Sequence, residues 1–176
     1  MSPIDNKRKF IPINIAVLSI SDSRTLKEDK SGDFLVKSIT DFGHYLYERK
    51  IVKDEPKSIK KTILFWVNNK KIDIIITTGG TGLTGRDSTP EVIRKISDKT
   101  IEGFGELFRQ ISYKKIGTST IQSRALGAII KGKYIFAIPG STNACKDAWN
   151  KILKFQLDNR YRPCNFVEIM PRLKEI

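Results

Sequence analysis

A strand that runs directly into a glycine-rich loop and a helix start lies near the middle of this 176-residue chain, at IDIIITTGGTGLTGRDSTPE (72–91). The isoleucine-rich run at its beginning is typical of a strand that is buried on both faces, as in a parallel sheet. The loop that follows leaves backbone N–H groups open to an anion, because glycines carry no Cβ. Its glycines are Gly79, Gly80, Gly82 and Gly85. This order predicts a phosphate site at the carboxyl end of a strand.

Two common nucleotide-binding loops do not fit this stretch. A Walker loop ends in Gly-Lys-Ser/Thr, whereas this loop runs Gly85-Arg86-Asp87 and offers no lysine to the outer phosphates. The glycine spacing also differs from the dinucleotide fingerprint. A plain glycine-rich turn between strand and helix remains an alternative. Asp87 favours a functional site over a plain turn, because a carboxylate in an anion-binding loop opposes phosphate unless it holds a metal ion or orients a substrate group.

The helix after this loop has the expected start signals. Ser88 or Thr89 can cap it, Pro90 suits its first position and Glu91 lies in its first turn. A similar arrangement recurs at 134–142, where an apolar strand runs into Pro139-Gly140-Ser141 and a long helix follows.

Other polar segments follow predicted strands. The first strand, 13–20, ends in Ser21-Asp22-Ser23-Arg24, whose hydroxyls and guanidinium can hold a ligand's polar edge. Asp54 follows a strand at 45–53 and precedes a helix at about 58–69, so it either interacts with the helix N-terminus or meets Asp87 across a substrate. Two such carboxylates would suit a magnesium ion that bridges phosphates. The cluster 118–124 either binds a phosphate or caps a helix.

Composition limits the class of protein. A chain of this length predicts one domain, and no apolar run approaches the length needed to span a membrane. The basic start without an apolar segment favours a cytoplasmic location. Cys145 and Cys164 are expected to be reduced thiols, and His44 is expected to lie at the surface or a strand edge.

The formal net charge of +13 is the unusual number in the composition. Nucleic acid, phospholipid or a small anion could each explain it. The lysines are scattered along the sequence, and no aromatic-basic interleaving accompanies them. We therefore expect neither a nucleic-acid partner nor a membrane.

Several motifs, taken together, resemble the MoaB/Mog family of molybdenum-cofactor biosynthesis proteins, and the resemblance covers roughly residues 12–166. The motifs are Ser19-Ile20-Ser21-Asp22, ITTGGTG (76–82), RDSTPE (86–91), EGFGE (102–106), Ser123-Arg124-Ala125 and Pro139-Gly140-Ser141. LTGRD (83–87) and RYRPCNF (160–166) are closest to the bacterial MoaB branch.

The resemblance implies a three-layer α/β/α sandwich with a mostly parallel central sheet. It would form a single molybdopterin-binding domain at 12–166, between a flexible N-terminal segment at 1–11 and a C-terminal tail at 167–176. Active members of the family join molybdopterin's terminal phosphate to AMP, with ATP as co-substrate and Mg²⁺. By resemblance Asp87 and Asp54 are the catalytic pair, and they would also be the magnesium ligands. The residues that would bind substrate are Ser19, Asp22, Gly79, Gly80, Thr81, Gly82, Ser123, Arg124, Pro139, Gly140 and Ser141.

Two functions remain open at this stage. The first is a molybdopterin adenylyltransferase, and the second is a non-catalytic pterin- or nucleotide-binding protein of the same pathway. Members of the family also assemble as trimers or hexamers, so the resemblance implies a homo-oligomer.

Overall fold

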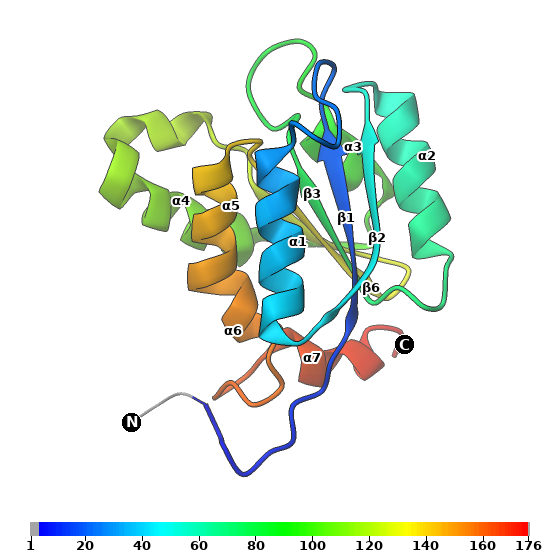
Figure 1. Cartoon of the computed structure of the whole chain (residues 1–176), viewed down its shortest axis with the longest axis vertical. Coiled ribbons are helices and arrows are strands. Elements are labelled where there is room, and N and C mark those ends of the chain that lie inside the picture. The colour runs from blue at the N-terminus through cyan, green and yellow to red at the C-terminus, as the bar shows by residue number, and fades with distance from the viewer. Residues whose placement is uncertain (1–3, 176) are drawn as a thin grey trace.

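The computed structural model describes residues 4–175, and a six-stranded sheet forms their centre (Figure 1). The strand order is β2-β1-β3-β6-β5-β4. The first four strands in this order are parallel, whereas β5 runs antiparallel to both β6 and β4. The strands are β1 (Asn14–Ile20), β2 (Tyr45–Val52), β3 (Ile74–Thr78), β4 (Lys99–Ile101), β5 (Leu126–Ile130) and β6 (Lys133–Ile138).

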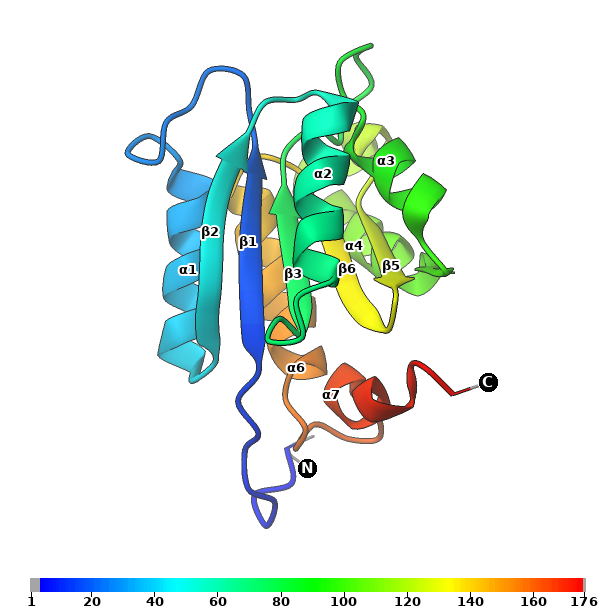
Figure 2. The same ribbon diagram turned by 90° about the vertical axis from the view of Figure 1, so that its right-hand side faces the viewer.

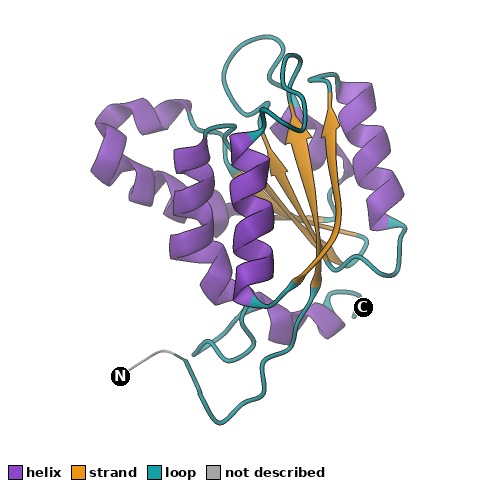
Figure 3. Cartoon of the chain, viewed as in Figure 1, coloured by secondary structure: helices purple, strands orange, loops and turns teal. Residues whose placement is uncertain are grey.

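Helices cover both faces of this sheet, as Figures 2 and 3 show. On one face lie α1 (Lys30–Phe42), α4 (Glu102–Ile116) and α5 (Thr142–Ala148), and on the other lie α2 (Pro56–Val67) and α3 (Thr89–Ile96). Shorter elements complete the chain: η1 (Gly117–Gln122), η2 (Trp149–Leu153), α6 (Lys154–Gln156), α7 (Phe166–Ile169) and η3 (Met170–Arg172). The predicted three-layer α/β/α sandwich with a mostly parallel sheet is confirmed.

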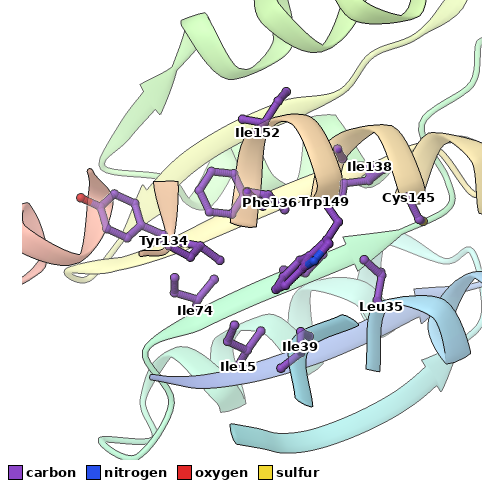
Figure 4. Packing of buried hydrophobic residues seen from close by; sticks show 14 of the residues in the cluster. Ile15, Leu35, Ile39, Ile74, Tyr134, Phe136, Ile138, Cys145, Trp149 and Ile152 are labelled. Atoms are coloured by element: carbon purple, nitrogen blue, oxygen red, sulfur yellow. The ribbon is translucent and has the colours of Figure 1, made fainter. Parts of the chain in front are cut away.

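The central strands are apolar on both faces because each face packs against its own helical layer. In β3, Ile74 and Ile76 join the cluster under α1 and α5, whereas Ile75 joins the cluster under α2 and α3. All three isoleucines are fully buried. Figure 4 shows the first cluster around Trp149, where Ile74, Phe136 and Leu35 meet. A continuous apolar run is therefore the correct signature of a strand between two layers.

Local signals fix several helix boundaries. Gly43 ends α1 in a left-handed conformation with φ +102°, and its N–H reaches the last carbonyls of the helix. Ser141 caps α5 by accepting a hydrogen bond from the N–H of Ala144 at 3.1 Å. The long helix predicted after Ser141 is interrupted by a π-helical turn at η2, which the 3.6-residue pattern does not reveal.

The segments at the two ends of the domain contact each other. Ile4 forms an antiparallel bridge with Tyr161, and the N–H of Ile11 donates to Asn159 Oδ1 at 2.8 Å. Asn159 in turn donates to the carbonyl of Lys9 at 3.0 Å. Residues 1–3 and 176, which belong to the expected flexible start and the expected tail, lie outside the described residues. Within residues 4–175, no helix is long and apolar enough to cross a membrane.

His44 directly precedes β2, in keeping with the expected strand edge, but it does not lie at the surface, because it is 97% buried against the rings of Phe10 and Phe42. Its Nδ1 accepts a hydrogen bond from the N–H of Ile13, and its Nε2 is buried without a partner among the described residues. Burial lowers the pKa of His44 to about 4, although the negative charge of Asp158 opposes the shift. The neutral imidazole is therefore part of the core.

Protonation of His44 should destabilise the fold below neutral pH. The folded chain's pKa is below the unfolded value of 6.5, so the unfolded chain binds the proton first as the pH falls. This contribution to stability is intact above pH 6.5 and lost towards pH 4. We expect the free energy of unfolding to fall by about 2 kcal/mol between pH 7.5 and 5. Urea unfolding of His44→Asn, which keeps an acceptor near Nδ1, should show a smaller fall; an equal fall would contradict the assignment.

Candidate functional site

The candidate site is a cavity of about 620 Å³ at the carboxyl ends of β1, β3 and β6. The loops that leave these strands lie together at the top of Figure 1. Gly79, Gly80, Gly82 and Asp87 come from the loop after β3, and Pro139 and Gly140 come from the turn after β6. Helices α4 and α5 supply the opposite wall. The four parallel strands thus bring distant loops to one edge of the sheet.

The three strand ends meet backbone to backbone. Gly79 has φ +106°, and a Cβ placed there would lie 2.2 Å from the carbonyl oxygen of Ile20 at the end of β1. A Cβ on Gly140 would lie 3.1 Å from Gly79 Cα. The N–H of Gly79 donates to the carbonyl of Ile138 at 3.0 Å, which ties the end of β3 to β6. Side chains are therefore excluded from the floor of the cavity.

Gly80 separates the cavity from Asp54. It has φ +62°, and a Cβ there would lie 2.4 Å from Thr89 Oγ1 and 3.0 Å from both Asp54 carboxylate oxygens. Asp54 Oδ1 and Thr89 Oγ1 are buried without a hydrogen-bond partner among the described residues. Burial raises the pKa of Asp54, and the negative charges of Asp87 and Asp22 raise it further. A cation in this place would stabilise the ionised Asp54.

Asp87 lines the cavity, and its pKa is shifted in the opposite direction from that of Asp54. Its Oδ2 accepts hydrogen bonds from the N–H of Thr84 at 2.9 Å and from Thr84 Oγ1 at 2.6 Å. Burial alone would raise the pKa of Asp87, but the hydrogen bonds from Thr84 and Gly82 and the charge of Arg124 outweigh it and lower the pKa. Asp87 is thus a preorganised carboxylate beside the glycine loop.

Asp22, in the loop after β1, contacts both Asp54 and Arg86. The N–H of Asp54 donates to Asp22 Oδ1 at 3.1 Å, and Arg86 pairs with Asp22 Oδ2 at 2.8 Å. The arginine of the glycine loop is therefore bound to the loop after β1.

The guanidinium of Arg124 braces the glycine loop. Its Nη2 donates to the carbonyl of Asp87 at 2.7 Å, its Nε donates to the carbonyl of Thr81 at 3.4 Å, and its Nη1 pairs with Glu91. One planar side chain thus fixes both arms of the loop to the start of α3. Its neighbour Ser123 lines the cavity, and the Ser123 hydroxyl has no partner among residues 4–175.

The loop after β1 is anchored by a buried ion pair. Asp29 is 99% buried and accepts hydrogen bonds from Ser19 Oγ, from the N–H of Gly32 and from Arg49 Nη2. Arg24, on the exposed part of this loop, donates to the carbonyl of Gly140 at 3.0 Å. This anchoring explains why Ser21 and Arg24 stay against the cavity.

The structure brings most of the predicted site residues to this cavity. Those that line it are Gly79, Gly80, Thr81, Gly82, Asp87, Ser123, Pro139, Gly140 and Ser141. Four others are not among the lining residues but contact the loops around the cavity: Ser19, Asp22, Asp54 and Arg124. Their assignment as catalytic, metal-binding or substrate-binding residues remains a prediction.

Sequence reasoning missed the wall formed by α4 and α5. Phe108, Ser112 and Ile116 of α4 line the cavity together with Asn143 and Asp147 around α5. Helical periodicity identifies the apolar face of a helix, but it does not reveal that one end of that face continues into a cavity. No sequence signal marks this wall, because Asp147 is one of several polar residues in α5, next to Lys146.

Magnesium fits this arrangement through two carboxylates. Among residues 4–175, no group of three or more acidic, histidine or cysteine side chains could hold a metal ion by itself. Mg²⁺ commonly binds one or two carboxylates and completes its coordination with water and substrate phosphates. The unpartnered Asp54 Oδ1, with the raised pKa of Asp54, is a suitable donor in the ionised state.

Comparison with known proteins gives consistent results. A family described as "Probable molybdopterin binding domain" matches residues 16–159. The molybdenum cofactor biosynthesis protein B of Escherichia coli (strain K12) is 43% identical over 167 residues, covering 95% of this chain and 96% of that protein. The protein of the same name from Bacillus subtilis (strain 168) is 37% identical over 142 residues, covering 80% of this chain and 84% of that protein.

Two solved structures have the same fold. A crystal structure of molybdenum cofactor biosynthesis protein B matches with a TM-score of 0.85 at 38% identity, covering 94% of this chain and 98% of that chain. The structure of the tungsten cofactor synthesizing protein MoaB from Pyrococcus furiosus matches with a TM-score of 0.73 at 33% identity, covering 80% of this chain and 90% of that chain.

Gly80 and Gly85 give a matched test of the loop. Gly80→Ala places a methyl group against Thr89 and Asp54 at positive φ, which should cost about 1–3 kcal/mol. Gly85 has no atom within 4 Å of its Cβ position, so Gly85→Ala should leave stability nearly unchanged. Urea unfolding and protease cleavage in the loop would measure both. Equal stability of the two variants would contradict the packing described.

Proposed function

Because the chain belongs to the MoaB/Mog family of molybdenum-cofactor biosynthesis proteins, we propose that it binds molybdopterin and adenylylates the terminal phosphate of that ligand with Mg-ATP. The observation that carries this proposal is the pair Asp54 and Asp87, placed on two sides of a glycine loop at the carboxyl edge of a parallel sheet. The loop offers N–H groups to phosphate, and the carboxylates offer oxygens to a cation.

The proposed reaction is a nucleotidyl transfer. An oxygen of molybdopterin's terminal phosphate attacks the α-phosphorus of ATP, a new P–O–P bond forms, and the bond to the β-phosphate breaks to release pyrophosphate. The attacking oxygen is already ionised at neutral pH, so the chain needs no general base. Its task is to position two anionic groups and to neutralise their repulsion.

Each part of the site has a defined task in this proposal. Gly80 and Thr81 would present backbone N–H groups to phosphate oxygens, because the N–H of Gly79 is bound to the carbonyl of Ile138 and that of Gly82 to Asp87. Arg24 would add a positive charge at the rim of the cavity. Arg124 holds the loop in this shape through the carbonyls of Thr81 and Asp87. A magnesium ion bound by Asp54 and Asp87 would neutralise charge on the phosphates during the transfer.

We further propose that the protein works in the cytoplasm as a homo-trimer or hexamer. Both cysteines are free thiols, which is usual for a cytoplasmic protein. On α4 and η1 the apolar side chains of Tyr113, Ile116 and Ile121 are more than half exposed, and Ile121 is 80% exposed. Such a patch suits contact with a second copy of this chain.

Neutralising either aspartate should abolish turnover and leave the fold intact. We expect Asp87→Asn and Asp54→Asn to reduce formation of adenylylated molybdopterin from ATP and Mg²⁺ by about 100-fold or more. Asp41→Asn is the matched control, because Asp41 lies on the far end of α1 and pairs only with Lys37 among the described residues.

Two results would contradict this assignment. Absence of product with the wild-type chain, while an active relative works in the same assay, would exclude the transferase. Pterin binding without turnover that is undiminished in Asp87→Asn would instead identify a non-catalytic binding protein of the same pathway.

The proposed assembly has its own test. Ile121→Lys places a charge on the exposed η1 patch and should shift the protein towards monomers in light-scattering measurements. Phe65→Lys is the control, since Phe65 is 63% exposed on α2, away from this patch. A wild-type chain that is monomeric at micromolar concentration would overturn the proposed oligomer.

A further inference from the structure

A second carboxylate lines the cavity besides Asp87. Asp147 lies on α5 and is 94% buried, at the wall where α5 faces α4. The proposed phosphate chemistry does not require an acid in this place. A buried carboxylate is costly unless it is paired, so the groups around it indicate what it does.

Two lysines hold only one oxygen of this carboxylate. Lys115 Nζ lies 2.6 Å from Asp147 Oδ1, and Lys151 Nζ lies 3.0 Å from the same oxygen. Among residues 4–175, Oδ2 has no hydrogen-bond partner. Burial alone would raise the pKa of Asp147, but the hydrogen bonds from Lys115 and Lys151 outweigh it and lower the pKa. Asp147 is therefore ionised at neutral pH and can only accept hydrogen bonds.

The surroundings of Asp147 suit a flat heterocycle. Phe108 and Ile116 give the cavity apolar surface beside it, and Ser112 and Asn143 add polar groups. The side chains of Ser112 and Asn143 have no hydrogen-bond partner within the described part of the chain. Apolar walls with a few convergent polar groups are typical of sites that orient a ring.

The two ends of the cavity thus differ in chemistry. The end near β3 has the backbone of the glycine loop, whereas the end near α4 has an anionic acceptor beside apolar side chains. A phosphate would be repelled by Asp147, so the charged part of a ligand belongs at the glycine loop. The ring of the same ligand is then directed towards α4.

We propose that Asp147 recognises the 2-amino-4-oxopyrimidine edge of the pterin, with Oδ2 accepting hydrogen bonds from the 2-amino group and the adjacent N3–H. Adenine fits this position poorly, because its N1 acceptor lies next to the 6-amino group and would face the carboxylate. Lys115 and Lys151 act as positioning residues that hold Oδ1 and leave Oδ2 to the ligand. This inference rests on the proposed function, because it assigns one end of the proposed molybdopterin site.

A matched pair of ligands tests the assignment on the full chain. 6-Hydroxymethylpterin carries the 2-amino group, whereas the corresponding lumazine carries an oxygen there, which would oppose the carboxylate. We expect fluorescence titration to show that the wild-type chain binds the pterin about 10- to 150-fold more tightly than the lumazine. Asp147→Asn should remove the preference for the pterin, whereas Asp147→Glu, which keeps a carboxylate, should retain part of it. Asp41→Asn should leave the preference unchanged.

The outcomes separate this inference from the proposed function. Equal binding of pterin and lumazine by the wild-type chain would overturn the role of Asp147, even if adenylylation is observed. An unchanged preference in Asp147→Asn, with a thermal melt that shows a folded protein, would also overturn it. If the asparagine variant does not fold, the glutamate variant and the wild-type comparison decide. If the wild-type chain prefers the pterin but shows no adenylylation, the transferase proposal is overturned and the role of Asp147 in pterin binding is supported.

Discussion

Three parallel strands end so close together that no side chain fits between them, and the rest of the site depends on this contact. A Cβ on Gly79 would overlap the carbonyl of Ile20, and a Cβ on Gly140 would crowd Gly79 Cα. The contact brings the loops after β1, β3 and β6 to one cavity, which residues from all three loops line. The apolar layers on both faces of β3 keep the three strand ends in place, because Ile74, Ile75 and Ile76 are fully buried.

The same packing determines the surroundings, and so the pKa values, of the two aspartates at the site. Gly80 allows Asp54 to lie directly behind the loop, where burial and neighbouring carboxylates raise its pKa. Asp87 lies on the cavity side, where Thr84 and Gly82 stabilise its ionised form. One carboxylate is thus preorganised, while the other gains from the arrival of a cation. In the proposed function a divalent ion with phosphate ligands would satisfy both, which links the absence of a Cβ at Gly80 to the proposed chemistry.

Much of this arrangement could be predicted from the sequence, because its signals are local. The apolar run into Gly79 and Gly80, the cap at Ser141 and the stop at Gly43 each depend on a few neighbouring residues. Features that depend on distant packing could not be predicted. Burial of His44 requires Phe10 and Phe42, the bracing role of Arg124 requires Glu91 and two carbonyls, and the α4 wall requires a helix to extend past the sheet.

The high net positive charge of the chain is not concentrated at the candidate site. Among the described residues that line the cavity, Arg24 is the only cation, against the two acids Asp87 and Asp147. Arg86, Arg124 and Lys115 are near the site, but each is paired with a carboxylate. Charges elsewhere on the surface are screened beyond about 8–10 Å at physiological salt. In the proposed function, ligand binding would therefore depend on backbone N–H groups and on a cation that arrives with the phosphates. The net charge of +13 is then a property of the surface and not of the candidate site.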